Sequence, residues 1–311
     1  MIIVFGSINM DMVIPVPHFP VAGETVLGLG DYAMLPGGKG ANQALAAARM
    51  GPKVALVGQI GDDGTGMRLM AGLRRDGVVT SGVGQSDKPT GMAIIMTDPT
   101  GENQIVVATG ANMDVRQDQV PDEILGPDAF LMLQGETPLE ENWALLQRAK
   151  NLGTHTFMNL APVIDIPVSA LEQLDYLVIN ELEVKQIADA LKMKADNALN
   201  LATALATTYK LTCIVTLGEK GSFAVTPTRK LIHVEALAIE DTVDRTGAGD
   251  AYCGTLAAML YVRKPLEDAM KMASIAGSLA CTKKGTQSAY AYLGEIEENL
   301  GNLAPPVIKT I

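Results

Sequence analysis

The stretch DRTGAGD, residues 244–250, combines two glycines with a carboxylate at the point where an apolar helical pattern begins. Gly247 and Gly249 allow backbone conformations in which consecutive amide groups point into one small space, and such a loop can bind an anion. A helix that begins near Asp250 adds the attraction of its free N–H groups and its dipole. Asp250 can either cap this helix or accept a proton from an attacking hydroxyl while the amides hold charge on a transferred phosphoryl group. This motif alone leaves both interpretations open.

A second glycine-rich stretch, PGGKGANQALAAARMG at residues 36–51, precedes a helical pattern that ends at Gly51. It does not have the spacing of a Walker phosphate loop, because Lys39 is followed by Gly40. The glycine fingerprint of a dinucleotide-binding strand and helix is also missing, which argues against a nicotinamide-dependent dehydrogenase. Asn42 carries a donor and an acceptor and suits a hydroxyl group. The glycines can equally serve only close packing of a helix on a sheet.

Asn180 ends an apolar strand, and Glu183 follows in the first turn of the next predicted helix. Ligands bind at the carboxyl ends of strands in open α/β sheets. An Asn and a Glu there can organise water around Mg²⁺, which keeps several waters and few protein ligands. The alternative is an ordinary helix start, in which Glu183 interacts favourably with the helix dipole.

Two further motifs place polar residues just beyond strands. Asn9 and Asp11 leave the first apolar strand, where they can bind sugar hydroxyls through paired hydrogen bonds or begin a turn. Thr216 and Gly218 follow a later strand, where they can meet nucleotide phosphates or form a plain hairpin. For each motif taken alone, an ordinary turn or hairpin is an alternative to a binding role.

Short apolar runs alternate with alanine-rich helical patterns over most of the chain. Continuous apolar strands separated by helices indicate an α/β fold with a mostly parallel sheet covered on both faces. The expected strands are 2–6, 53–61, 128–134, 154–162, 174–180 and 211–218, and residues 214–225 read as strand, turn and strand. The expected helices are 39–50, 64–76, 138–152, 181–192, 196–209, 250–261 and 265–282.

Two segments interrupt this alternation. Residues 12–35 contain three prolines and no helical pattern, and residues 91–109 read as two strands joined by a turn around 99–102. We expect both to add antiparallel strands to the main sheet. They suit a lid whose closure excludes water, and a peripheral hairpin layer is the equal alternative.

Composition narrows the class of protein. The 311 residues are 48% hydrophobic and carry a net charge of −11, which argues against a nucleic-acid or anionic-membrane partner. The chain has neither the basic start of a signal peptide nor the run of roughly 18 apolar residues that a membrane span needs. Its cysteines and histidines lack metal or disulfide spacing, so we expect a reducing, cytoplasmic location. They are Cys213, Cys253, Cys281, His18, His155 and His233.

The order of GSINMD, GGKGANQA, NELE, TLGEKG and DRTGAGD along the chain resembles the ribokinase family of carbohydrate kinases. The resemblance runs from residue 2 to about residue 290. It implies a ribokinase-like three-layer αβα sandwich with a small β-sheet lid, in a single domain over residues 1–311. It also implies ATP-dependent phosphorylation of a sugar's primary hydroxyl, with D-ribose as the leading substrate. Deoxyribose, another pentose, a ketohexose-type sugar, a nucleoside, and a non-catalytic sugar-binding regulator are the alternatives.

The resemblance implies roles for individual residues. Asp250 is expected to be the catalytic base, and Gly247, Ala248 and Gly249 are expected to form the anion hole. The implied sugar-binding residues are Asn9, Asp11, Gly38, Lys39, Asn42 and Glu136, together with Asp250. The implied nucleotide-binding residues are Asn180, Thr216 and Gly218, and Glu183 is expected to hold Mg²⁺ through water. In this family the lid often forms a dimer interface, which implies a homodimer.

The sequence departs from the family pattern at three places. NLAP at 159–162 stands where Asn-Pro-Ala-Pro is common, so Leu160 gains a backbone donor. Arg245 stands where a small or apolar residue is usual, and it can either add positive charge near phosphates or face solvent. Several members bind K⁺ beside the anion hole, and Ala289 replaces a serine that often contributes an oxygen there. The matching K⁺ positions in this chain are Asp244, Thr246, Ala280, Lys283 and Gly285.

Overall fold

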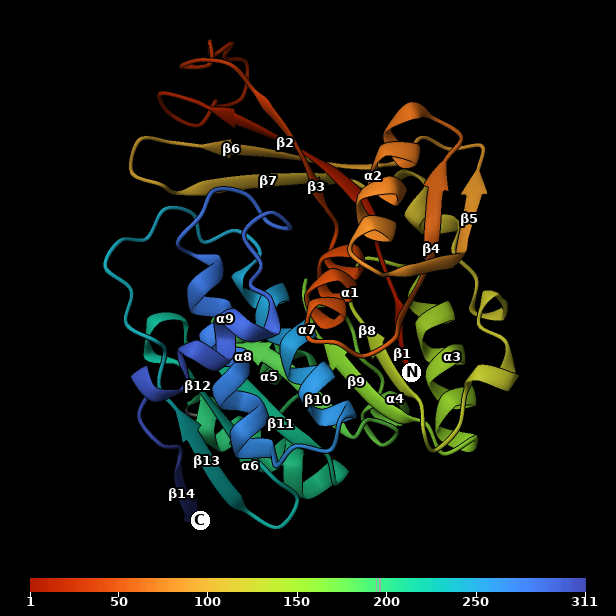
Figure 1. Cartoon of the computed structure of the whole chain (residues 1–311), viewed down its shortest axis with the longest axis vertical. Coiled ribbons are helices and arrows are strands. Elements are labelled where there is room, and N and C mark those ends of the chain that lie inside the picture. Colours follow the sequence, from red (N-terminus) through yellow and green to blue (C-terminus); the bar gives the residue numbers. More distant parts are fainter. Residues whose placement is uncertain (194, 196) are drawn as a thin grey trace.

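Ten strands form the main sheet of the computed structural model, which describes residues 1–193, 195 and 197–311 (Figure 1). Their order is β14-β13-β12-β11-β10-β9-β8-β1-β4-β5. Pairing is parallel from β11 to β5 and antiparallel from β11 to β14, which confirms the mostly parallel sheet. The strands are β1 (Ile2–Phe5), β4 (Val54–Gly61), β5 (Val79–Ser86), β8 (Phe130–Leu133), β9 (His155–Asn159), β10 (Tyr176–Asn180), β11 (Thr212–Thr216), β12 (Ser222–Val225), β13 (Lys230–Val234) and β14 (Val307–Thr310).

Alternating side chains of the strands supply two cores, one on each face of the sheet. Ile2 and Val4 of β1 pack into one core, and Ile3 and Phe5 pack into the other. The first core is closed by α1 (Lys39–Arg49), α2 (Gly64–Arg75), α7 (Ala248–Tyr261), α8 (Leu266–Ala280) and α9 (Leu293–Glu298). The second is closed by α3 (Leu139–Asn151), α4 (Val168–Leu171), α5 (Glu183–Ala190) and α6 (Ala198–Tyr209). The expected three-layer αβα arrangement is therefore confirmed.

Small residues let α1 and α7 pack closely against each other. A Cβ atom on Gly254 of α7 would lie 2.5 Å from the backbone oxygen of Gln43 and 2.6 Å from the Cβ atom of Ala46, both in α1. Only glycine fits at this crossing. The contact holds the first turns of the two helices side by side.

A separate sheet of four strands contains both segments that interrupt the α/β alternation. Its order is β3 (Ala33–Gly37), β2 (Asn9–Pro15), β6 (Gly91–Thr97) and β7 (Asn103–Ala108). The expectation that these strands add to the main sheet is wrong, and the β2–β6 pair is parallel rather than antiparallel. The reason is that β2 continues almost directly from β1, which is already paired on both sides. β2 can therefore only extend beyond the end of the main sheet.

The β6–β7 hairpin is confirmed, and most predicted elements agree with the structure to within a few residues. The expected first residue of the helix at 196–209 lies outside the described residues. Sequence patterning missed β5, β13 and β14, because most of their residues are half-buried or exposed and they lack continuous apolar runs. Every helix in the described part of the chain is too short or too polar to cross a bilayer.

Candidate active site

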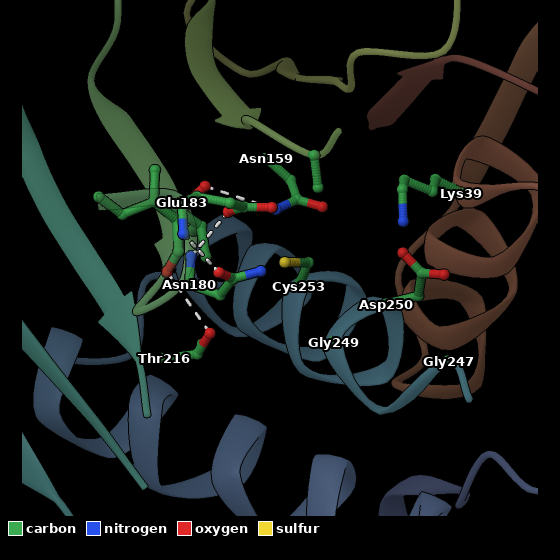
Figure 2. Close-up of a pocket in the computed structure, with 12 residues that line it drawn as sticks. Lys39, Asn159, Asn180, Glu183, Thr216, Gly247, Gly249, Asp250 and Cys253 are labelled. Atoms are coloured by element: carbon green, nitrogen blue, oxygen red, sulfur yellow. Dashed lines mark hydrogen bonds between the residues drawn. The ribbon is translucent and has the colours of Figure 1, made fainter. Parts of the chain in front are cut away.

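A pocket opens where the carboxyl ends of β9, β10 and β11 face the first turn of α7 (Figure 2). This is the edge of the sheet where α/β proteins bind ligands. The residues that line it are Lys39, Asn159, Ala161, Val178, Ile179, Asn180, Glu183, Thr216, Gly247, Gly249, Asp250 and Cys253. The predicted residues from four distant motifs therefore meet in one place.

The first turn of α7 borders this pocket, which Gly247 and Gly249 line. Gly247 is the N-cap of α7 and has a left-handed φ of 78°. A Cβ atom there would lie 2.7 Å from the hydroxyl of Tyr290, so both conformation and space require glycine. Nothing lies within 4 Å of a Cβ built on Gly249, which leaves open space beside the helix start. Gly247 and Gly249 therefore lie at a helix N-terminus beside open space, the kind of place where anions bind, whereas the N–H of Ala248 donates to the backbone oxygen of Arg245 at 3.4 Å.

Asp250 lies in the first turn of α7 and is only 7% exposed. Its Oδ2 accepts a hydrogen bond of 3.0 Å from Asn42 Nδ2, and its Oδ1 accepts one of 2.9 Å from Gln43 Nε2. The ammonium group of Lys39 faces the carboxylate across the pocket (Figure 2). Asp250 therefore touches both the anion site and the residues of α1.

Burial and the neighbouring acidic groups shift the pKa values of Lys39 and Asp11. Burial lowers the pKa of Lys39, but the carboxylates of Asp250 and Glu136 outweigh burial and raise it. Burial, together with the charges of Glu136 and Asp250, raises the pKa of Asp11 to about 7. Lys39 is therefore fully charged near neutral pH, whereas Asp11 changes its charge there.

The other predicted sugar-binding residues surround the same acidic cluster. Glu136 Oε2 accepts hydrogen bonds from Ser7 Oγ at 2.5 Å and from the Lys39 backbone N–H at 3.2 Å. Gly38 has a φ of 86°, and a Cβ atom on it would lie 2.6 Å from the backbone nitrogen of Asn9. The structure therefore brings Asn9, Asp11, Gly38, Lys39, Asn42 and Glu136 together around Asp250.

Asn180 and Glu183 lie on the opposite side of the pocket from Asp250 (Figure 2). The backbone N–H of Asn180 donates to Glu183 Oε2 at 2.8 Å, and that of Glu183 donates to Asn180 Oδ1 at 2.9 Å. These reciprocal bonds make the pair a helix start, as one interpretation predicted. Burial raises the pKa of Glu183. Asn180 also pairs with Thr216 across β10 and β11, while Gly218 is exposed beyond β11 with a φ of 60°.

A divalent cation at this pocket would have few protein ligands. No cluster of three or more His, Cys, Asp or Glu residues arranged around a metal position occurs among the described residues. Mg²⁺ usually takes only one or two carboxylates and keeps several waters. Glu183, which lines the pocket, fits that pattern.

Asp244 joins the two loops predicted to hold a monovalent cation. Its Oδ1 accepts from the Thr246 backbone N–H at 2.9 Å and its Oδ2 from that of Gly285 at 3.0 Å. The side chain of Lys283 turns toward Glu295, 3.5 Å away, and Ala280 is buried at the end of α8. Among the predicted K⁺ positions, only Asp244, Thr246 and Gly285 are therefore joined by hydrogen bonds, all of them made by the Asp244 side chain.

The departures from the family pattern have clear structural outcomes. Arg245 has a side chain that is 70% exposed and pairs with Glu219, so it faces solvent rather than the pocket. The N–H of Leu160 donates to the backbone oxygen of Val178 at 3.0 Å. The donor gained at Leu160 thus extends the pairing of β9 with β10.

Several polar residues of the site escaped sequence analysis. Gln43 Nε2 donates both to Asn159 Oδ1 and to Asp250 Oδ1. Asn112 Nδ2 donates to Asn9 Oδ1 at 2.7 Å. Gln287 donates to Asn42 Oδ1 at 3.1 Å. Gln43 could have been predicted as a site residue, because it directly follows Asn42 in the sequence. Asn112 and Gln287 lie outside the recognised motifs, so no local pattern marked them.

Comparison with known proteins agrees with this geometry. The sequence profile of the pfkB family carbohydrate kinases matches residues 1–291. The chain is 35% identical to the ribokinase of Haemophilus influenzae, over 92% of this chain and 93% of that protein. It is 31% identical to the deoxyribokinase of Salmonella typhi, over 96% of this chain and 98% of that protein.

Solved structures show the same fold. The crystal structure of ribokinase from Thermotoga maritima superimposes with a TM-score of 0.86 at 30% identity, covering 97% of this chain and 99% of that chain. Ribokinase from Arabidopsis thaliana complexed with ribose and ATP gives a TM-score of 0.84 at 28% identity, covering 96% and 98%. With its two sheets, its glycine-rich helix start and its buried aspartate, the chain belongs to the pfkB family of carbohydrate kinases, which are ATP-dependent sugar kinases.

Proposed function

We propose that this sugar kinase transfers the γ-phosphoryl group of ATP to the primary hydroxyl of D-ribose, which gives ribose 5-phosphate. One observation carries the proposal: the buried carboxylate of Asp250 lies between the polar cluster of Asp11 and Glu136 and the open amides at the start of α7. A hydroxyl held by the cluster and a phosphoryl group held by the amides would meet at this carboxylate. The similarity to ribokinases supports ribose as the acceptor.

Proton transfer and charge stabilisation are divided between the two sides of the site. Asp250 accepts the hydroxyl proton as the new O–P bond forms and the bond to ADP breaks. The amides of Gly247, Ala248 and Gly249 and the ammonium of Lys39 stabilise the charge that develops on the transferred oxygens. ATP lies along Asn180, Thr216 and Gly218, and Mg²⁺ supplies further charge stabilisation when it is held through water by Glu183. We also propose that K⁺ binds between the loops formed by residues 244–246 and 283–285.

Deoxyribose is the second candidate acceptor, because a deoxyribokinase is nearly as similar as several ribokinases. The two sugars differ by one hydroxyl, which a few hydrogen bonds can discriminate. A non-catalytic sugar-binding protein is disfavoured, because Asp250, Gly247, Gly249 and Lys39 line one pocket, as the proposed chemistry requires.

Replacing Asp250 with Asn tests the proposed base. Asn cannot accept the proton, so kcat for ribose should fall by roughly 10²-fold or more, while the ribose Kd measured by calorimetry changes only a few-fold. Lys185→Gln serves as the control, because Lys185 lies in α5 and is exposed. A D250N enzyme that keeps more than about a tenth of the wild-type rate would rule out the base role.

A substrate panel tests the acceptor and the cation together. ADP release is measured with ribose, deoxyribose, fructose, 2-keto-3-deoxygluconate and adenosine, each with Na⁺ or K⁺ as the only monovalent cation. We expect the largest kcat/KM with ribose and K⁺. Turnover of another sugar with none for ribose would refute ribose as the substrate, and equal rates in Na⁺ and K⁺ would refute the cation site.

The pKa of Asp11 predicts that ribose affinity depends on pH. Asp11 is mostly neutral below its pKa of about 7 and mostly ionised above it. Only the ionised carboxylate can accept hydrogen bonds from sugar hydroxyls with both oxygens. Affinity for ribose should therefore rise about tenfold between pH 6 and pH 8. In Asp11→Asn, calorimetry should show weaker binding without this rise. Parallel pH profiles in the two proteins would contradict the assignment.

We also propose that residues 1–311 act as one catalytic domain, with the four-stranded sheet as its lid, and that two copies associate through this sheet. β7 is an edge strand whose residues are all exposed, including Val106 at 61%. An exposed apolar edge strand favours pairing with another chain.

The Val106→Lys variant tests the interface by placing a charge on that edge. Sedimentation velocity should give a dimer for the wild type and a monomer for V106K. Val168→Lys is the matched control, because Val168 is a similarly exposed valine in α4 on the main domain, and it should stay dimeric. A monomeric wild type, or a dimeric V106K, would exclude this interface.

A further inference from the structure

Two pairs of side-chain amides converge on the Asp250 carboxylate. In the first, Gln134 Nε2 donates to Gln43 Oε1 at 3.0 Å, and Gln43 Nε2 donates to Asp250 Oδ1 at 2.9 Å. In the second, Gln287 Nε2 donates to Asn42 Oδ1 at 3.1 Å, and Asn42 Nδ2 donates to Asp250 Oδ2 at 3.0 Å. Each carboxylate oxygen thus receives one amide proton from α1.

The outer glutamine sets which way each inner amide points. A side-chain amide can turn either its oxygen or its nitrogen toward a carboxylate, and the oxygen would be repelled. Gln134 donates to the oxygen of Gln43, so the nitrogen of Gln43 must face Asp250. The second proton of Gln43 Nε2 is used as well, because it reaches Asn159 Oδ1 at 3.0 Å.

Burial makes this orientation hard to reverse. Gln43 is fully buried, and Gln134 is nearly so. Gln134 Oε1 has no hydrogen-bond partner among the described residues, and a Cβ atom on Gly6 would lie 2.0 Å from it. An unpaired buried acceptor is unfavourable. Gln134 nevertheless keeps its donor on Gln43, which is the orientation that serves Asp250.

We propose that Gln43, oriented by Gln134, is a positioning residue that fixes the rotation of the Asp250 carboxylate and keeps one lone pair of each oxygen free for the acceptor hydroxyl. The inference rests on the proposed function, in which Asp250 is the base. Gln43 does not line the pocket and reaches it only through Asp250 and Asn159. A charge-assisted hydrogen bond of this kind favours the ionised carboxylate, which is the form that accepts the proton.

The Gln43→Met variant removes both hydrogen-bonding groups and nearly preserves the volume. We expect kcat for ribose to fall roughly 10- to 100-fold, which corresponds to the loss of one hydrogen bond to a charged group. The KM for ribose should stay within about threefold, because Gln43 is not expected to touch the sugar. The acid limb of the kcat profile should move to higher pH, since the ionised carboxylate has lost a donor.

The Gln134→Met variant tests whether Gln134 acts on Asp250 through Gln43, and it changes no residue that contacts Asp250. It should lower kcat in the same direction, and the Q43M/Q134M double variant should lose less than the product of the two single losses. Thr156→Val is the matched control. Thr156 is fully buried in β9 and donates to the Gln173 backbone oxygen at 2.7 Å, at the far end of the strand from Asn159. T156V should lower stability yet keep the wild-type pH profile.

A measurement that does not depend on turnover separates this inference from the proposed function. The full-length protein is labelled with ¹³C at aspartate carboxyl groups, and the Asp250 resonance is assigned with D250N and titrated. In Q43M its titration midpoint should move to higher pH. If it moves in a protein that phosphorylates no sugar, the positioning role stands and the proposed function fails. If midpoint, pH profile and kcat all match the wild type in both Q43M and Q134M, the positioning role is overturned.

Discussion

The contact between α1 and α7 is the constraint on which the rest of the site depends. The two helices belong to segments about 200 residues apart in the chain, and neither carries a complete set of catalytic groups. Gly254 allows backbone to approach backbone at their crossing, and this closeness lets the short side chains of α1 reach the carboxylate of Asp250. Dense packing against the sheet then holds the pair rigidly, because α7 is buried from Asp250 to Leu260. Accurate positioning of the charged groups is a property of the hydrophobic core.

The sequence was sufficient to predict the elements that are buried on both sides. Strands such as β1 and β8 consist of continuous apolar residues, and the helices between them have clear starts and ends. The strands that were missed, such as β5, carry half-exposed polar residues whose strand character comes from pairing rather than from a local pattern. The small sheet was assigned to the wrong place because pairing partners distant in the chain are not encoded locally.

The residues of the candidate site also divide into those that a local sequence pattern marks and those that it does not. Residues inside glycine-rich motifs, such as Asp250 and Lys39, could be predicted, because backbone geometry demands glycine at neighbouring positions. The amides that orient these residues could not, because Gln134 and Gln287 lie in segments without a distinctive composition. For Asn180 and Glu183 the two interpretations are compatible, since Asn180 Oδ1 accepts from the first N–H of the helix and both residues still line the pocket. A pattern typical of helix capping therefore does not exclude a functional role.

The direct passage from β1 into β2 gives the small sheet a fixed pivot. Residues 6–8 link β1 to the small sheet and are held by two hydrogen bonds: Ser7 Oγ donates to Glu136, and the N–H of Ile8 donates to Asn112 Oδ1 at 2.8 Å. Any rotation of the small sheet must turn about this point, which lies beside Asn9 and Asp11. Under the proposed function, in which the small sheet is the lid and this cluster binds the sugar, a small displacement at this hinge would become a larger movement at the far ends of β2 and β6. Binding of the acceptor and closure of the lid would then be a single movement.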